Sequence, residues 1–217
     1  LTASNREGLG DSVPEFESGA LNAAGKRVVV IGGGDTAMDC VRTSIRQGAA
    51  SVTCLYRRDK ANMPGSMREV ANAEEEGVRF SWLSAPDAFL GGNVGRVEGV
   101  RAVRMHLGVP DASGRQQVEP VANSEFVEPA DLVIKALGFD PENLPALFNE
   151  PALTVTRWGT LKVDHRTMMT ALPGVFAAGD IVRGASLVVW GIRDGRDAAD
   201  QICRYVDAVE GVPLAAE

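Results

Sequence analysis

One glycine-rich turn in the sequence has the spacing that the phosphates of a dinucleotide require: Gly32-Gly33-Gly34-Asp35-Thr36-Ala37. Gly32 permits a tight turn, and Gly34 lacks the Cβ that would keep a pyrophosphate away from the backbone. Ala37 takes the third small position of the G-x-G-x-x-G/A pattern, where a helix approaches the preceding strand. The start of that helix offers N–H groups and the positive end of its dipole to an anion. We therefore predict a dinucleotide site at residues 32–37.

Asp35 is the discordant residue of this motif, because a carboxylate beside a pyrophosphate repels it. We expect its side chain to cap N–H groups of the helix or to point away from the ligand. Without a ligand, the same residues would form an ordinary strand-to-helix turn, which is the alternative interpretation.

Two arginines indicate which dinucleotide the turn would hold. A site that prefers NAD places Asp or Glu near the end of the second strand, roughly twenty residues after the glycines. This sequence has Tyr56-Arg57-Arg58 there, and guanidinium groups can bind a 2′-phosphate through charged hydrogen bonds. We therefore predict NADP(H). In the alternative interpretation both arginines are solvated, and Asp59 partly neutralises them.

Apolar periodicity places these motifs on a sheet with helices. Buried strands are predicted at 28–31, 51–56 and 78–83, and helices at 36–47 and from the turn at 62–66 to residue 76. Short alternating segments at 97–107 and 117–121, with turns at 91–93 and 111–114, are typical of antiparallel strands. A continuous apolar strand returns at 131–137. The predicted fold class is α/β, a Rossmann-like three-layer nucleotide-binding domain with a parallel sheet plus a small antiparallel layer.

The last part of the chain forms a separate unit in this interpretation. We expect a hairpin at 153–163, a short strand at 174–180, and a helix at 187–209 with Ser186 as its N-cap. A strand that ends in Gly179-Asp180 before a helix can place a carboxylate against sugar-like hydroxyls. An ordinary strand and helix is an equally good interpretation of the residues alone.

Composition excludes several classes of function. With 217 residues and a net charge of -7, the chain has no basic stripe for nucleic acid, and no apolar run is long enough to cross a membrane. We expect a cytoplasmic location. Cys40, Cys54 and Cys203 lack the spacing of a metal or cluster site and are expected to be buried. His106 and His165 are expected to be structural or surface residues, so we predict no metal site and no catalytic acid or base.

Several motifs together resemble the small (beta) subunit family of NADPH-dependent glutamate synthases. They are the glycine turn at 32–37, Tyr56-Arg57-Arg58-Asp59, Met63-Pro64-Gly65, Ala136-x-Gly138-x-x-Pro141, Gly174–Asp180 and Ser186–Arg196. The resemblance runs over nearly the whole chain. It implies a fold of the FAD/NAD(P)-binding pyridine nucleotide oxidoreductase type, with a partial second FAD-domain segment.

The resemblance also implies an activity. Members of that family are oxidoreductases that pass hydride from NADPH to FAD, and iron–sulfur clusters then carry electrons to the large (alpha) subunit, which makes glutamate. By motif, NADPH would be held by Gly32, Gly33, Gly34, Asp35, Thr36, Ala37, Arg57 and Arg58, and Gly138 would be a further cofactor-binding residue. The flavin would lie against Gly179, Asp180, Leu187 and Val188. Hydride transfer depends on positioning the two cofactors, so no catalytic acid or base is implied.

The chain departs from that family in lacking the cysteine-rich cluster ligands and the first glycine fingerprint for FAD. Because the sequence also begins at Leu1, we expect a piece of a longer protein, with a linker at 1–24, an NADPH-binding domain at 25–140 and the C-terminal part of an FAD-binding domain at 141–217. The piece is expected to bind FAD weakly or not at all and to be inactive alone. An apolar patch and an open strand edge in 143–217 would favour self-association. The alternatives are another NADPH-dependent flavoprotein reductase of the same plan and a non-catalytic NADPH-binding module.

Overall fold

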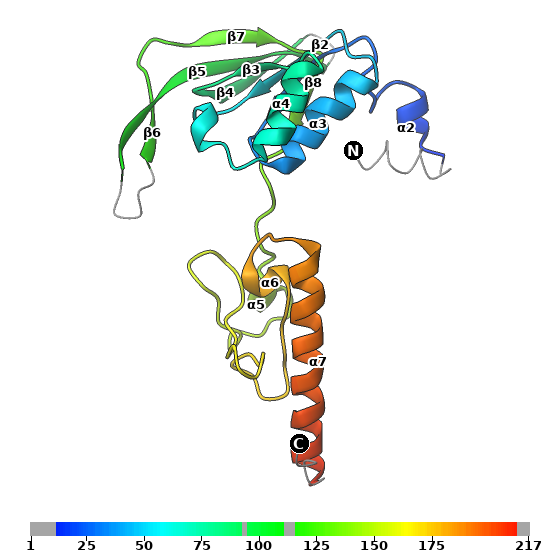
Figure 1. Cartoon of the computed structure of the whole chain (residues 1–217), viewed down its shortest axis with the longest axis vertical. Helices are drawn as coiled ribbons and strands as arrows, with labels where there is room; N and C mark the ends of the chain where they lie inside the picture. Colours follow the sequence, from blue (N-terminus) through cyan, green and yellow to red (C-terminus); the bar gives the residue numbers. More distant parts are fainter. Residues whose placement is uncertain (1–11, 93–94, 111–115, 212–217) are drawn as a thin grey trace. The chain divides into compact units, whose positions relative to one another are not determined.

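The computed structural model describes residues 12–92, 95–110 and 116–211. The chain divides into two compact units that meet between Leu137 and Gly138, and each unit is described by itself. The first unit contains two sheets with covering helices, and the second contains helices and irregular segments (Figure 1). The sequence placed the corresponding boundary after residue 140.

A parallel sheet organises the first unit. Its strand order is β3-β2-β1-β8. The strands are β1 (Arg27–Ile31), β2 (Ser51–Leu55), β3 (Arg79–Ser81) and β8 (Leu132–Lys135). Residues 28–31 of β1 are at most 3% exposed, so this central strand is buried on both faces, as its run of branched apolar residues predicts.

Two helices cover one face of the parallel sheet. These are α3 (Asp35–Arg46) and α4 (Met67–Glu75), which lie side by side in both figures. Val28 and Val30 pack with Met38 of α3 and Val70 of α4 in one cluster of buried side chains. Alternate β1 residues therefore belong to the helical layer.

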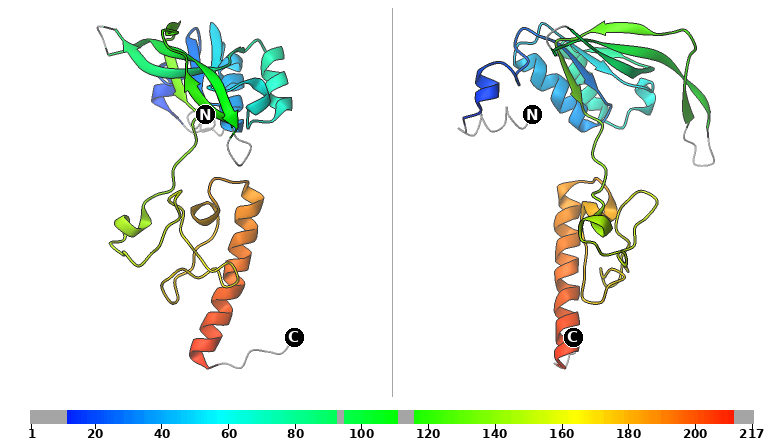
Figure 2. Two further views of the ribbon diagram at one scale, coloured as in Figure 1. Left: turned by 90° about the vertical axis from the view of Figure 1, so that its left-hand side faces the viewer. Right: turned by 180° about the vertical axis from the view of Figure 1, so that it is seen from behind.

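An antiparallel sheet covers the other face, as Figure 2 shows from two further directions. Its strands are β4 (Ser84–Gly91), β5 (Val97–Pro110), β6 (Gln116–Pro120) and β7 (Phe126–Pro129). Val29 and Ile31 of β1 pack with Val100 and Ala102 of β5 in a second cluster. The predicted three-layer α/β fold is confirmed. The predicted turn at 111–114 and Asn93 lie outside the described residues.

The segment before β1 packs on the first unit along its described part. It contains the short helix α2 (Pro14–Glu17), and Val13 and Ala23 are buried. The ammonium group of Lys26 donates to the carbonyl oxygen of Asn22 at 2.7 Å and also to that of Gly19. These bonds fix the described residues of the predicted linker, whose residues 1–11 lie outside the described part.

The second unit has helices but no strands in its described residues. The helices are α5 (Leu144–Leu147), α6 (Asp180–Arg183) and α7 (Val188–Glu210). The predicted hairpin at 153–163 is reduced to one bridge between Val155 and Leu161, and the predicted strand at 174–180 to one bridge between Phe176 and Met169. Both predictions were wrong because no neighbouring strand completes a ladder. The expected open strand edge is therefore absent from the described residues of this unit.

Helix α7 is confirmed, but its start differs from the prediction. Leu187 is the N-cap residue and no side chain caps the helix, so the assignment of Ser186 as N-cap was wrong. Only Asp194 and Ala198 of α7 are buried. Large apolar side chains are exposed along it, as the sequence predicts: Leu187, Val188, Val189, Trp190, Ile192, Ile202, Val206 and Val209. None of the helices in the described ranges has the length and apolar character to span a membrane.

Candidate functional site

The glycine turn joins the end of β1 to the start of α3, at the carboxyl edge of the parallel sheet. Gly32 has a φ of +148°, and a Cβ there would lie 2.2 Å from the carbonyl oxygen of Ala136. Ala136 follows β8, so the close approach of the turn to β8 requires a glycine. The chain continues from β1 to β2 on one side, whereas β8 pairs with β1 on its other side. Such a change of direction is a switch point, where ligands bind in open α/β sheets.

The next two glycines differ in their surroundings. A Cβ on Gly33 would lie 2.3 Å from the ring of Tyr56, whereas a Cβ on Gly34 would meet no atom within 4 Å. Gly34 is also the N-cap residue of α3. The backbone at Gly34 and the exposed residue Thr36 therefore face open space. Ala37 is completely buried in the helix-side cluster, as close packing of α3 on β1 requires.

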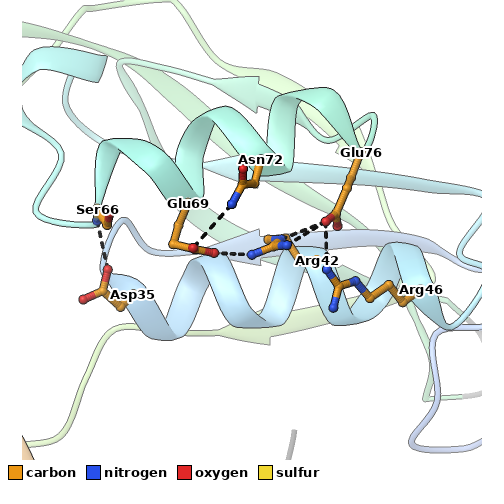
Figure 3. Close-up of polar contacts among 7 residues, drawn as sticks. All are labelled: Asp35, Arg42, Arg46, Ser66, Glu69, Asn72 and Glu76. Atoms are coloured by element: carbon orange, nitrogen blue, oxygen red, sulfur yellow. Dashed lines mark hydrogen bonds and ion pairs between the residues drawn. The ribbon is translucent and has the colours of Figure 1, made fainter.

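Asp35 neither caps its own helix nor points freely into solvent. Its Oδ1 accepts the backbone N–H of Ser66 at 2.9 Å, as Figure 3 shows. Next to this bond, the N–H of Gly65 donates to the carbonyl oxygen of Gly33 at 2.9 Å. The segment Met63–Ser66 is thus tied to the glycine turn by two bonds that the local sequence pattern does not reveal.

A charged network continues the contact between α3 and α4 (Figure 3). Arg42 pairs with Glu69 and, at 2.8 Å, with Glu76, and Arg46 pairs with Glu76 at 2.9 Å. Hydrogen bonds from Arg42 and then from Arg46 hold the pKa of Glu76 below its ordinary value. The hydrogen bond to Glu76 in turn raises the pKa of Arg42. The network fixes the register of the two helices whose N-terminal ends meet beside the glycine turn.

Arg57 and Arg58 follow β2 at the same edge of the sheet. Arg57 is exposed, and no acid of the described residues pairs with either arginine. Arg58 is partly buried, and its Nη2 donates to the carbonyl oxygen of Gln116 at 3.1 Å. Asp59 accepts instead from the backbone N–H and Nδ2 of Asn62 at 2.9 and 2.7 Å, and so caps the short helix η1 (Lys60–Asn62). Asp59 therefore pairs with neither arginine, unlike in the alternative interpretation in which it partly neutralises them.

In the second unit, two hollows meet at Asp180. One of about 520 Å³ is lined by residues that include Asp140, Trp158 and Ile181, and another of about 420 Å³ by residues that include Leu187 and Val188. Gly179, with a φ of +73°, is the N-cap of α6 and puts Asp180 at the mouth of both. The structure thus brings together the residues in which the sequence predicts flavin contacts. Gly138, at the start of this unit, has a φ of +86°.

An ion pair that the sequence did not predict joins the exposed Arg183 to the buried Asp194. Arg183 of α6 donates to both carboxylate oxygens of Asp194 in α7, with Nε–Oδ2 at 2.9 Å and Nη2–Oδ1 at 2.6 Å. Asp194 is 6% exposed, and the bonds from Arg183 keep its pKa below the ordinary value. The acid in Arg193-Asp194-Gly195 is thus a structural tie between α6 and α7.

The cysteines and histidines give no metal site in the described part of the chain. Cys40 and Cys54 are buried as expected, and burial raises the pKa of Cys54 to about 12. Cys203 is exposed on α7, so the prediction that it is buried was wrong. His106 is half-exposed and lies 3.4 Å from a carboxylate oxygen of Glu119.

Residues 4–195 match the family described as pyridine nucleotide-disulphide oxidoreductase. The chain is 68% identical over 215 residues to the glutamate synthase [NADPH] small chain of Azospirillum brasilense, which covers 99% of this chain and 44% of that protein. It is 51% identical to the corresponding small chain of Escherichia coli over 86% of this chain and 40% of that protein. The resemblance predicted from the motifs is confirmed. The chain spans less than half the length of these curated relatives.

Solved structures agree on the fold. Thioredoxin reductase of T. acidophilum matches with a TM-score of 0.68 and 22% identity, over 90% of this chain and 56% of that one. FprA from Mycobacterium tuberculosis in complex with NADPH matches with a TM-score of 0.69 and 19% identity, over 94% of this chain and 58% of that one. At such identities the matches bear on the fold alone, and they agree with the predicted α/β nucleotide-binding fold.

Proposed function

The chain belongs to the pyridine nucleotide-disulphide oxidoreductase family, and from that premise we propose that it is the NADPH-binding portion of a flavin-dependent glutamate synthase small subunit. In the complete protein it would serve the passage of hydride from NADPH to FAD. Electrons would then reach a glutamate-forming large (alpha) subunit. The proposal implies a cytoplasmic location.

One observation carries the proposal: an open glycine at a helix N-terminus lies at the same sheet edge as an arginine without an acidic partner among the described residues. A Cβ at Gly34 would meet nothing within 4 Å, so a pyrophosphate can approach the backbone there. The N-terminus of α3 favours an anion. Arg57 follows the neighbouring strand β2, where the sugar of the adenosine lies in such sites.

The residues present therefore fit NADPH. Backbone N–H groups at Gly34 and the start of α3 would hold the pyrophosphate, and Arg57 would bind the 2′-phosphate. Gly32, Gly33 and Ala37 serve close packing in this arrangement, and Asp35 ties the turn to Ser66. Bound NADPH would supply the hydride. The contribution of the chain is to position the dinucleotide and to distinguish it from NADH.

The second unit fits one side of a flavin site. The carboxylate of Asp180 can accept hydrogen bonds from the hydroxyl groups of a ribityl chain. Leu187 and Val188 border the adjoining hollow. Because these hollows are open and their rims exposed, we expect the purified chain to bind FAD weakly and to be colourless. Gly138, with a φ of +86°, is a further proposed cofactor-binding residue.

The proposal is tested by titrating the 217-residue chain with NADPH and with NADH. We expect NADPH to bind more tightly, and Arg57→Ala to weaken NADPH about 10- to 100-fold while hardly affecting NADH, the loss expected for a charged hydrogen bond. Arg96→Ala is the matched control. Arg96 is exposed and lies just before β5. The carbonyl oxygen of the nearby Glu98 accepts a hydrogen bond from the N–H of Ala130, just before β8, so this region lies toward the amino ends of the parallel strands and away from Arg57. Equal losses for both cofactors would contradict the assignment.

Another reductase of the same plan is a second candidate. The chain is also 49% identical to the putative oxidoreductase AegA of Escherichia coli, over 95% of this chain and 31% of that protein. The complete protein separates the two functions. Glutamate formation from glutamine and 2-oxoglutarate after addition of the large subunit supports the first proposal, and dye reduction without glutamate formation supports the second.

A further inference from the structure

Arg57 and Arg58 are adjacent in sequence, but the structure gives them different surroundings. Arg57 is exposed, and no bond from its guanidinium group is found in the described part of the chain. Arg58 is partly buried, and its Nη2 donates at 3.1 Å to the carbonyl oxygen of Gln116, the first residue of β6. One N–H group of Arg58 is therefore already used in a hydrogen bond within the protein.

Gln116 belongs to an arm formed by the outer half of β5 and by β6. The inner half of β5 pairs with β4 and β7, up to Arg104, whereas the only described strand that pairs with residues 105–110 is β6 (Figure 2). At the base of the arm, the N–H of Met105 also donates to the carbonyl oxygen of Leu83 at 2.8 Å. The arm also contains an irregularity between Leu107 and Pro110. Isolated two-stranded ribbons are marginally stable in water, so the arm needs further contacts to keep its place. The bond from Arg58 is such a contact.

The side chain of Gln116 strengthens this anchor. Its Nε2 donates to the carbonyl oxygen of Gly108 on β5 at 3.3 Å, which fixes the residue whose own carbonyl oxygen accepts from Arg58. A line of bonds thus runs from the end of β2 through Gln116 to β5. Gln117, the next residue, is exposed, and no hydrogen bond of its side chain is found among the described residues.

A guanidinium group grips a phosphate best through two parallel N–H groups. No N–H group of the Arg57 guanidinium is bonded to any residue that the structure describes, so Arg57 can offer two of them, whereas Arg58 would first have to release Gln116. We infer that the two arginines divide the recognition of the 2′-phosphate monoester: Arg57 contacts it, and Arg58 is a positioning residue that holds the β5–β6 arm beside the site. Gln116, outside the motif, then becomes a specificity-determining position. The inference rests on the proposed function.

The test is a double-mutant cycle on the 217-residue chain, with dissociation constants for NADPH and NADH from cofactor fluorescence. We expect Arg57→Ala to cost NADPH about 10- to 100-fold, Arg58→Ala about 3- to 10-fold and Gln116→Ala about 2- to 3-fold, with NADH unchanged. Gln117→Ala is the matched control and should change neither. Arg58→Lys retains a donor and should stay within about 2-fold of the parent chain.

The energetic coupling between the substitutions shows whether Arg58 positions the β5–β6 arm or contacts the phosphate directly. Gln116→Ala should add nothing to Arg58→Ala, because both break the same line of bonds, and should multiply with Arg57→Ala. A loss with Arg58→Ala as large as with Arg57→Ala, together with a neutral Gln116→Ala, would overturn the inference. So would multiplicative losses of Arg58→Ala and Gln116→Ala. A parent chain that does not discriminate NADPH from NADH would instead overturn the proposed function.

Discussion

Asp35 and Ser66 lie 31 residues apart in the chain and join the N-terminal ends of α3 and α4: Oδ1 of Asp35 accepts a hydrogen bond from the N–H of Ser66 at 2.9 Å. Ser66 is the N-cap residue of α4, and its own side chain makes no capping bond. The acid that the sequence marks as discordant in a phosphate-binding turn thus satisfies a backbone donor of the neighbouring helix. It also leaves a negative charge close to the proposed pyrophosphate position.

The two roles of Asp35 can be separated by substitution. Asp35→Asn keeps an oxygen that can accept from Ser66 and removes the charge, so we expect an unchanged melting temperature and NADPH binding that is about 2- to 5-fold tighter. Asp35→Ala removes the bond as well and should lower the melting temperature by about 2–4 °C. Calorimetry and NADPH titration measure both. Weaker binding by Asp35→Asn would show that the carboxylate helps to form the site.

Gly33 and Gly34 should respond differently to the same added methyl group. Gly34→Ala meets no atom within 4 Å in the protein, so the chain should remain as stable as before, but its Cβ would stand where the pyrophosphate approaches. We expect NADPH binding to fall at least about 10-fold. Gly33→Ala would press on the ring of Tyr56 and should destabilise the first unit by about 1–3 kcal/mol. Urea unfolding and NADPH titration of both variants measure these effects. Normal NADPH binding by Gly34→Ala would contradict the prediction.

The bonds around Glu76 predict a pH dependence of stability. The pKa of Glu76 is lowered mainly by Arg42, so the carboxylate contributes stability above the ordinary glutamate pKa of about 4.3, and this is lost as pH falls through the lower folded value. Arg42→Ala should flatten the unfolding profile below about pH 4.3, where this contribution is lost. Arg46→Ala should change it less, because Arg46 is 64% exposed and donates one hydrogen bond to Glu76 where Arg42 donates two. Unchanged acid profiles in both variants would contradict the assignment.

The ion pair of Arg183 and Asp194 should stabilise the second unit alone. Asp194→Ala removes both bonds that join α6 to α7 and should expose the second unit to limited proteolysis at lower temperature. The affinity of the first unit for NADPH should not change. Asp197→Ala is the control on the same helix, because its contact with Arg193 is long, at 3.6 Å, and exposed. A comparable effect of Asp197→Ala would argue against a specific role of Asp194.

The exposed apolar side chains of α7 are expected to cause self-association of the isolated chain. Ile202 and Val206 lie one turn apart, so they share a face of the helix. Sedimentation over a range of concentrations should show dimers or larger species, and Val206→Lys should weaken them. Ala208→Lys adds the same charge at an exposed position without removing a large apolar side chain and should have little effect. A monomer at every concentration would refute the prediction.

The elements of the first unit could be predicted because their signals are local. The apolar run of β1, the glycine turn and the amphipathic helices each lie within a short stretch, and the register follows from packing on both faces of β1. The bonds that complete the site could not be predicted in the same way. Arg58 with Gln116 and Arg42 with Glu76 join residues that are far apart in sequence and that meet only when the layers assemble.

In the second unit, the sequence predicted more regular structure than the protein has. Residues 174–180 have the composition of a buried strand, but a strand needs a partner that supplies its backbone hydrogen bonds, and the described residues of this unit supply only single bridges. Local propensity therefore overestimated regular structure there. The long helix α7 was predicted because a helix satisfies its own backbone.

The two clusters of buried side chains begin at Ala23 and end at Ala136, so both are complete before the unit boundary after Leu137. A gene truncated after Leu137 would remove no member of either cluster. The first unit therefore has what an autonomous folding domain needs, and the proposed nucleotide turn and both arginines lie within it. Such a domain could be transplanted into another flavoprotein to exchange its choice of reductant, with the joint placed at Gly138.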